Sequence, residues 1–78
     1  MKTAEERGME MMHIPMGQLP PLALEFAEML CKQVGKCGEV LLTAWITYAQ
    51  CVEGLKCTDS LYKAGLSEFE WFNSRRDR

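Results

Sequence analysis

The sequence predicts an all-α protein in which three to four short helices form one domain and the end of the chain forms a helix-turn-helix unit. Apolar residues recur three and four positions apart in the middle of the chain, which is the spacing of one face of a helix. Glycines and prolines stand near the ends of these apolar segments. With 78 residues, 47% of them hydrophobic, the chain is long enough for one small domain and too apolar for a disordered one.

Residues 1–18 show no clear periodicity and are predicted to form a flexible, methionine-rich leader outside a single helical domain at residues 19–78. Gly8, Pro15 and Gly17 interrupt this segment. Because methionine packs well against irregular partners, an adaptable contact surface is the alternative role of the leader.

The first helix of the domain is predicted over residues 20–34. Two prolines stand at its start, where a missing backbone N–H costs nothing. Leu22, Phe26 and Leu30 follow at helical spacing. Gly35 then marks the end of the helix.

The second helix is predicted over residues 39–53, between Glu39, whose charge suits the positive end of the helix dipole, and Gly54. This segment is apolar on nearly every side, and such a helix should be covered on two sides. The first helix is one expected cover. The other is either the C-terminal segment or a second copy of the chain.

Two further helices are predicted at the C-terminus, over residues 58–64 and 67–77. Gly65 separates them at a place where a positive φ angle is expected. Ser67 and Glu70 have the spacing of a capping box, in which a serine caps the start of a helix and a glutamate three residues on bonds back to it. The predicted arrangement is therefore helix, tight turn, helix.

The segment from Asp59 to Asp77 resembles the homeodomain-like helix-turn-helix of phage small terminase subunits, transposases and small bacterial regulators. In that group an Ala-Gly-Leu/Val-Ser turn joins a short helix to a recognition helix that carries an aromatic residue early, and this chain has Ala64-Gly-Leu-Ser67. The resemblance covers residues 55–78, or residues 39–78 if the second helix is the leading helix of the unit.

The resemblance implies binding to duplex DNA, with the last helix in the major groove. Arginine suits the acceptors of guanine, and serine, arginine and lysine suit phosphate oxygens. Such a protein would serve packaging or transcription control in a phage or mobile element, as a homo-oligomer because one motif gives limited affinity. The side chains expected to contact DNA or another partner are Lys63, Ser67, Trp71, Ser74, Arg75, Arg76 and Arg78.

The charge of the chain favours a second function. The net charge is -2, and residues 1–54 carry a net charge of -3 while residues 55–78 carry +1. Glu68 and Glu70 would repel phosphates at the start of the predicted recognition helix. The alternative is a small acidic inhibitor or adaptor that binds a host protein complex, as phage-encoded anti-CRISPR proteins do.

The four cysteines, Cys31, Cys37, Cys51 and Cys57, form two C-x5-C pairs. Reduced thiols that pack as small apolar groups are the favoured interpretation, because the N-terminus does not have the form of a secretory signal. Two disulfides that staple a helical hairpin are an alternative. A zinc site is a further alternative, although the spacing is unlike that of the usual zinc knuckles.

The sequence does not predict an enzyme or a cofactor. It has one histidine, His13, and it lacks a glycine-rich phosphate loop and a paired set of carboxylates. It also lacks a run of about 18 apolar residues that would span a membrane. The predicted location is the cytoplasm of the host cell.

Overall fold

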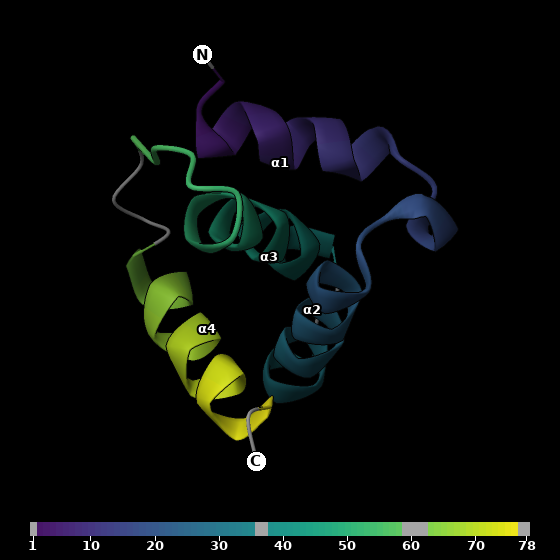
Figure 1. Ribbon diagram of the computed structural model, residues 1–78. Coiled ribbons are helices and arrows are strands. Elements are labelled where there is room, and N and C mark those ends of the chain that lie inside the picture. Colours follow the sequence, from purple (N-terminus) through teal and green to yellow (C-terminus); the bar gives the residue numbers. More distant parts are fainter. Residues whose placement is uncertain (1, 36–37, 59–62, 77–78) are drawn as a thin grey trace.

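The computed structural model of the chain describes residues 2–35, 38–58 and 63–76. These residues form four α-helices and one short 3-10 helix, with no strand among them (Figure 1). The prediction of an all-α protein with three to four helices is confirmed. The elements are α1 (Ala4–His13), η1 (Met16–Gln18), α2 (Pro21–Val34), α3 (Gly38–Cys51) and α4 (Lys63–Arg76).

Helix α3 is the centre of the molecule. It contacts α1, α2 and α4, which surround it in Figure 1. Its residues from Ala44 to Ala49 are all buried in succession, as expected for a helix that is apolar on nearly every side. Its covers therefore come from within the chain: α2 and the C-terminal helix, as the sequence suggested, and α1 as well.

Helix α2 lies inside the range predicted for it. Pro21 occupies the first turn, and Gly35 caps the end of the helix in the left-handed conformation, with a φ angle of 75°. Its buried face carries Phe26, whose ring meets Phe69 of α4 edge-on at 5.0 Å between ring centroids and lies 5.5 Å from Phe72. Three aromatic rings at these distances stabilise the contact between α2 and α4 beyond the burial of their area.

The prediction of a flexible leader at residues 1–18 is wrong, because residues 4–13 form α1. Thr3 caps this helix, since its side-chain oxygen accepts a hydrogen bond from the backbone N–H of Glu6. Ala4, Gly8 and Met11 form its buried side. This stripe is narrow and contains a glycine, so it gives a weak hydrophobic pattern in the sequence although it packs against α3.

Polar contacts fasten the start of α1 to the segment that follows α3. The backbone N–H of Ala4 donates to the carbonyl of Lys56 at 2.8 Å. One carboxylate oxygen of Glu5 accepts from the backbone N–H of Thr58 at 2.5 Å and from its hydroxyl at 2.9 Å. Arg7 donates to Glu53 at 3.0 Å, and this bond raises the pKa of Arg7.

The turn predicted at Gly65 is also wrong, because α4 runs unbroken from Lys63 to Arg76. Among the described residues only Gly35 and Gly54 have a positive φ angle. Ser67 therefore lies inside a helix, and the capping box that it was expected to open with Glu70 does not start one. Most of the short helix predicted over residues 58–64 falls on residues 59–62, which lie outside the described part of the chain.

Gly65 serves close packing and not a turn. A Cβ atom added at Gly65 would collide with the side chain of Thr47, which is fully buried in α3. Gly8 of α1 has the same role against Ile46, the residue before Thr47 in α3. A Cβ atom added at Gly8 would stand 2.5 Å from a side-chain carbon of Ile46. Two glycines thus let two helices approach α3 at consecutive residues.

Candidate functional site

The exposed side of α4 holds the residues predicted from the sequence to contact a partner. Ser67, Trp71, Ser74 and Arg75 lie on one stripe of the helix, and all four are exposed. The guanidinium carbon of Arg75 stands 4.6 Å from the centre of the Trp71 ring, which is a cation–π distance. The structure therefore brings these four side chains to one surface.

The other three predicted site residues are placed less fully. Lys63 and Arg76 are the terminal residues of α4, and their side chains lie outside what the structure describes. Arg78 lies outside the described residues altogether. The part of the predicted site that can be examined is therefore the middle of α4.

Acidic groups accompany this stripe. Glu70 is exposed on α4, and its charge acts together with partial burial to raise the pKa of the Cys51 thiol at the end of α3. Burial is the larger cause of that shift. A surface that mixes Arg75 with Glu70 is less favourable for phosphates than a uniformly basic one.

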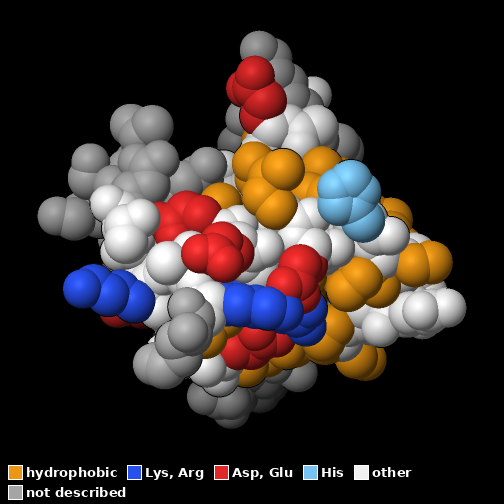
Figure 2. All heavy atoms as spheres, turned by 90° about the horizontal axis from the view of Figure 1, so that it is seen from above, with side chains coloured by type: hydrophobic (Ala, Val, Ile, Leu, Met, Phe, Trp, Pro, Cys, Tyr) orange, Lys and Arg blue, Asp and Glu red, His pale blue; other side chains and the backbone are white. Residues whose placement is uncertain are grey.

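Sequence reasoning did not place a second surface, which we call the methionine stripe and which consists of Met9, Met12 and Met16. Their exposed fractions are 53%, 43% and 52%. Met9 and Met12 are exposed residues of α1, and Met16 begins η1. Figure 2, which views the molecule from above Figure 1, shows hydrophobic side chains gathered on one part of this face and charged ones on another.

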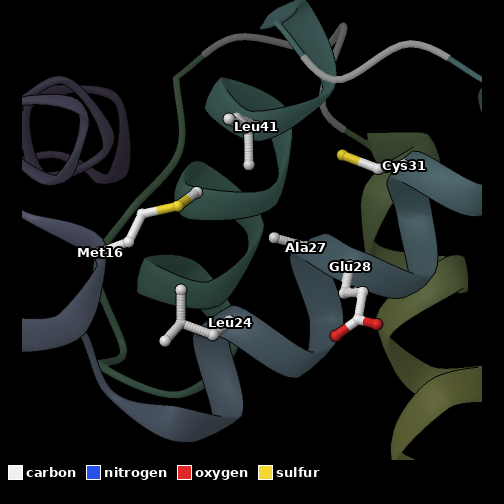
Figure 3. A pocket seen from close by; sticks show the side chains of 6 residues that line it. All are labelled: Met16, Leu24, Ala27, Glu28, Cys31 and Leu41. Atoms are coloured by element: carbon white, nitrogen blue, oxygen red, sulfur yellow. The ribbon is translucent and has the colours of Figure 1, made fainter.

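A hollow with a volume of about 330 Å³ adjoins the methionine stripe at Met16, and we call it the α2–α3 hollow. The side chains in Figure 3 come from η1, α2 and α3 and surround the hollow. Glu28 is its charged side chain, and the others are apolar or carry sulfur. Its lining residues are Met16, Leu24, Ala27, Glu28, Cys31 and Leu41.

A second hollow, of about 390 Å³, lies on the other side of Glu28, between α2 and α4. Glu25, Lys32 and Phe72 are among its lining residues. Glu28 lines both hollows and forms a strongly exposed ion pair with Lys32 at 3.4 Å. This pair contributes little to stability, because water screens it.

The spacing of the methionines was a signal that could have located this surface. Residues 9 and 12 are three positions apart, which is the spacing of one side of a helix, and residue 16 follows in η1. Gly8 concealed this helix, because glycine usually interrupts or ends a helix. In the structure Gly8 lies inside α1 and Pro15 lies between α1 and η1.

The cysteines and acids do not gather into a metal site in the described residues. No three His, Cys, Asp or Glu side chains stand close enough there to hold a metal ion. The Cys57 thiol donates toward Glu5 at 3.3 Å, Cys51 carries a free and exposed thiol, and Cys37 lies outside the described residues. Cys51 therefore forms no disulfide in this structure.

Two surfaces are therefore candidates for binding: the outer side of α4, and the methionine stripe with the α2–α3 hollow. None of the helices, within the described residues, has the length and apolarity to cross a membrane. No protein-family model, curated protein or solved structure matches this chain.

Proposed function

We propose that this chain is a small protein-binding domain, which docks another protein on the methionine stripe and the adjoining α2–α3 hollow. The observation that carries the proposal is the exposure of Met9, Met12 and Met16, the last of which lines an apolar hollow. Exposed apolar side chains that adjoin one another are typical of binding surfaces. Methionine suits such a surface because its flexible, polarisable side chain adapts to a partner.

The free energy of binding requires that the partner cover both the methionine stripe and the α2–α3 hollow. Each methionine is already about half buried, so covering it completely contributes roughly 1 kcal/mol. The three together contribute on the order of 3 kcal/mol, whereas micromolar binding needs about 8 kcal/mol net. The α2–α3 hollow must therefore receive side chains of the partner and supply much of the remainder.

The biological role that fits this function is that of a small acidic inhibitor or adaptor of a host protein complex, of the kind that phages encode. The net charge of -2 supports a protein target over a nucleic acid. The unbroken course of α4 supports it too, since the tight turn that carried the likeness to DNA-binding proteins is not formed at Gly65.

The test is capture of partners from the cell that produces the chain, with nuclease present, by the wild type and by a variant combining Met9→Gln, Met12→Gln and Met16→Gln. We expect a stoichiometric protein on the wild type and its loss on the triple variant. Val52→Gln is the matched control, since Val52 is also an exposed apolar residue but lies outside the stripe. Equal capture by the wild type and the triple variant contradicts the proposal.

DNA binding is a second candidate, favoured by the exposed stripe of Ser67, Trp71, Ser74 and Arg75. An arginine stacked on an exposed tryptophan, with two hydroxyls on the same side, can contact phosphates and bases. The check is a mobility shift with duplex DNA at low salt. Binding that Arg75→Ala weakens and Lys56→Ala leaves unchanged supports this candidate, and no shift at low salt eliminates it.

A further inference from the structure

We infer that α4 opens locally at its start: residues 63–67 separate from α3 in a minor population of molecules, while the rest of α4 stays packed through its phenylalanines. This inference does not rest on the proposed function, because the methionine stripe and the α2–α3 hollow include no residue of α4. It follows from the different ways in which the two parts of α4 are held, and from a buried hydroxyl beneath the start of the helix.

The start of α4 lies on a polar side of α3. Four polar residues share this side, at intervals of three and four positions: Glu39, Thr43, Thr47 and Gln50. Gly65 stands against it, since a Cβ atom added at Gly65 would meet the side chains of Thr47 and Thr43. At Gly65, α4 therefore rests on hydroxyl-bearing side chains and not on the hydrophobic core.

The hydroxyl of Thr47 gains nothing from this contact. Thr47 has no exposed surface, and its side-chain oxygen makes no hydrogen bond with any residue that the structure describes. A buried hydroxyl of this kind has given up its hydrogen bonds to water without replacing them, which favours an opening that restores them by about tenfold. Thr43 differs, because its hydroxyl donates to the backbone carbonyl of Glu39 at 3.3 Å.

The apolar contacts that hold α4 come later in the helix. Phe69 and Phe72 are the described side chains of α4 that pack in the hydrophobic core, and the rings of both meet Phe26. Before them, Leu66 is only partly buried and Ser67 is exposed. Separating the start of α4 from α3 therefore exposes little apolar surface, whereas separating the later part would break a cluster of three rings.

The opening gives the exposed side of α4 two arrangements. Ser67 moves with the opening segment, whereas Trp71 and Arg75, which stack on each other, stay with the packed part. In the open form Ser67 leaves the stripe and the hydroxyl of Thr47 becomes accessible to water. A partner that needs the whole stripe binds the closed form, and its binding should suppress the opening.

The test is hydrogen exchange of the backbone amides of the wild-type chain, followed by NMR. In a helix the amides of residues 67–69 bond to the carbonyls of residues 63–65, so they report on the start of α4. After correction for intrinsic rates, we expect them to exchange at least tenfold faster than the amides of Tyr48 and Ala49 in α3 and of residues 72 and 73 in α4. Their exchange should respond little to low concentrations of urea, as local openings do.

Two pairs of variants test the hydroxyl of Thr47 as the cause. Thr47→Ala and Thr47→Ser differ only in a hydroxyl, so the loss of the methyl group is common to both. We expect the amides of residues 67–69 to exchange at least threefold more slowly in Thr47→Ala than in Thr47→Ser. The matched pair Thr43→Ala and Thr43→Ser should show no such slowing, because the hydroxyl of Thr43 has a partner. Circular dichroism checks that all four variants retain their helices.

Each part of the inference can be overturned separately. If residues 67–69 are as protected as the α3 amides, or respond as steeply to urea, α4 opens only with the whole domain and the inference is wrong. It is also wrong if residues 72 and 73 exchange as fast as residues 67–69, because the opening then has no packed end. Equal exchange in the two Thr47 variants, or slower exchange in Thr47→Ser, overturns the hydroxyl as the cause. The wild-type pattern decides on the opening even where a variant fails to fold, and capture by the methionine stripe is tested independently.

Discussion

Helices α1 and α4 flank the same central helix, and both approach it through a glycine. Gly8 meets Ile46 and Gly65 meets Thr47, which is the next residue of α3. The two flanks then differ in how they are held. Helix α1 packs Ala4, Gly8 and Met11 against the core and adds hydrogen bonds and an ion pair to residues 53–58, whereas α4 packs the rings of Phe69 and Phe72 against Phe26.

The contacts that hold the two flanking helices contribute differently to the free energy of unfolding. Aromatic burial on the α4 side contributes several kcal/mol, while partly exposed polar contacts on the α1 side contribute about 1 kcal/mol or less each. Helix α1 adds its own buried packing to these polar contacts, since Ala4, Gly8 and Met11 are buried, and its exposed residues include Met9 and Met12 of the methionine stripe.

The largest expected effect is on the α4 side. Phe26→Ala removes the ring that meets both Phe69 and Phe72, and Phe26 is fully buried. We expect a loss of about 3–5 kcal/mol in the free energy of unfolding, enough to unfold much of a domain this small. Urea denaturation followed by circular dichroism measures it. Phe26→Leu should retain the fold with a smaller loss, and a wild-type midpoint for Phe26→Ala would contradict the aromatic contact.

The glycine contacts give the next effect. Alanine at Gly8 or Gly65 should destabilise the fold by about 1–2 kcal/mol, because a collision costing about 1–3 kcal/mol outweighs the gain of up to about 1 kcal/mol in helix propensity. The collisions cannot be relieved cheaply, because Ile46 and Thr47 are buried. Gly38→Ala is the control: Gly38 lies in α3 with open space around it and should be neutral or stabilising.

The ion pair on the α1 side gives a smaller effect. Glu53→Gln removes the charge that pairs with Arg7, whose side chain and partner are each about one quarter exposed. We expect a loss below about 1 kcal/mol that shrinks further at high salt. Glu28→Gln, which breaks the much more exposed pair with Lys32, should change the free energy of unfolding by less. A larger loss in the free energy of unfolding from Glu28→Gln than from Glu53→Gln would contradict the expectation that the less exposed ion pair stabilises the fold more.

The smallest effect reports on the approach of α4 to the end of α3. Burial and the charge of Glu70 raise the pKa of Cys51, so the thiolate fraction at neutral pH is below that of an ordinary cysteine. Glu70→Gln removes one of these causes, lowers the pKa and should accelerate alkylation of Cys51 by less than about threefold at pH 8. Mass spectrometry of the Cys51 peptide measures the rate. Glu68→Gln should leave that rate unchanged.

The sequence could predict the middle of the molecule because each signal there has one meaning. The prolines before α2, the glycine after it and the apolar repeat of Phe26 and Leu30 all indicate the same helix. The apolar circumference of α3 indicated a covered helix, and the structure supplies its covers from α1, α2 and α4. The exposure of Trp71 and Arg75 on one side of α4 also followed from helical spacing.

The two flanks were harder to predict because a glycine has two uses. One glycine can allow a positive φ angle and another can allow two helices to approach closely, and the sequence does not distinguish these two roles. Gly65 looked like a turn and Gly8 like an interruption, but both lie inside helices at contacts with α3. Only the position of Ile46 and Thr47 relative to them distinguishes the two uses, and that position is tertiary information. The sequence suggested an adaptable contact surface in the methionine-rich segment as an alternative to a flexible leader, but it did not define that surface, which depends on α1 being a helix.

A measurement of the backbone conformation at Gly65 tests this account most directly, because that conformation decides between one long α4 and a helix-turn-helix. Backbone assignment by NMR gives the Cα secondary shifts of residues 63–70 and the contact between the Hα of Ala64 and the amide of Ser67. A continuous α4 predicts positive, helical Cα shifts throughout and a visible contact over those three residues. A non-helical shift at Gly65 and Leu66 without that contact would contradict the account and restore the turn, and with it the case for DNA.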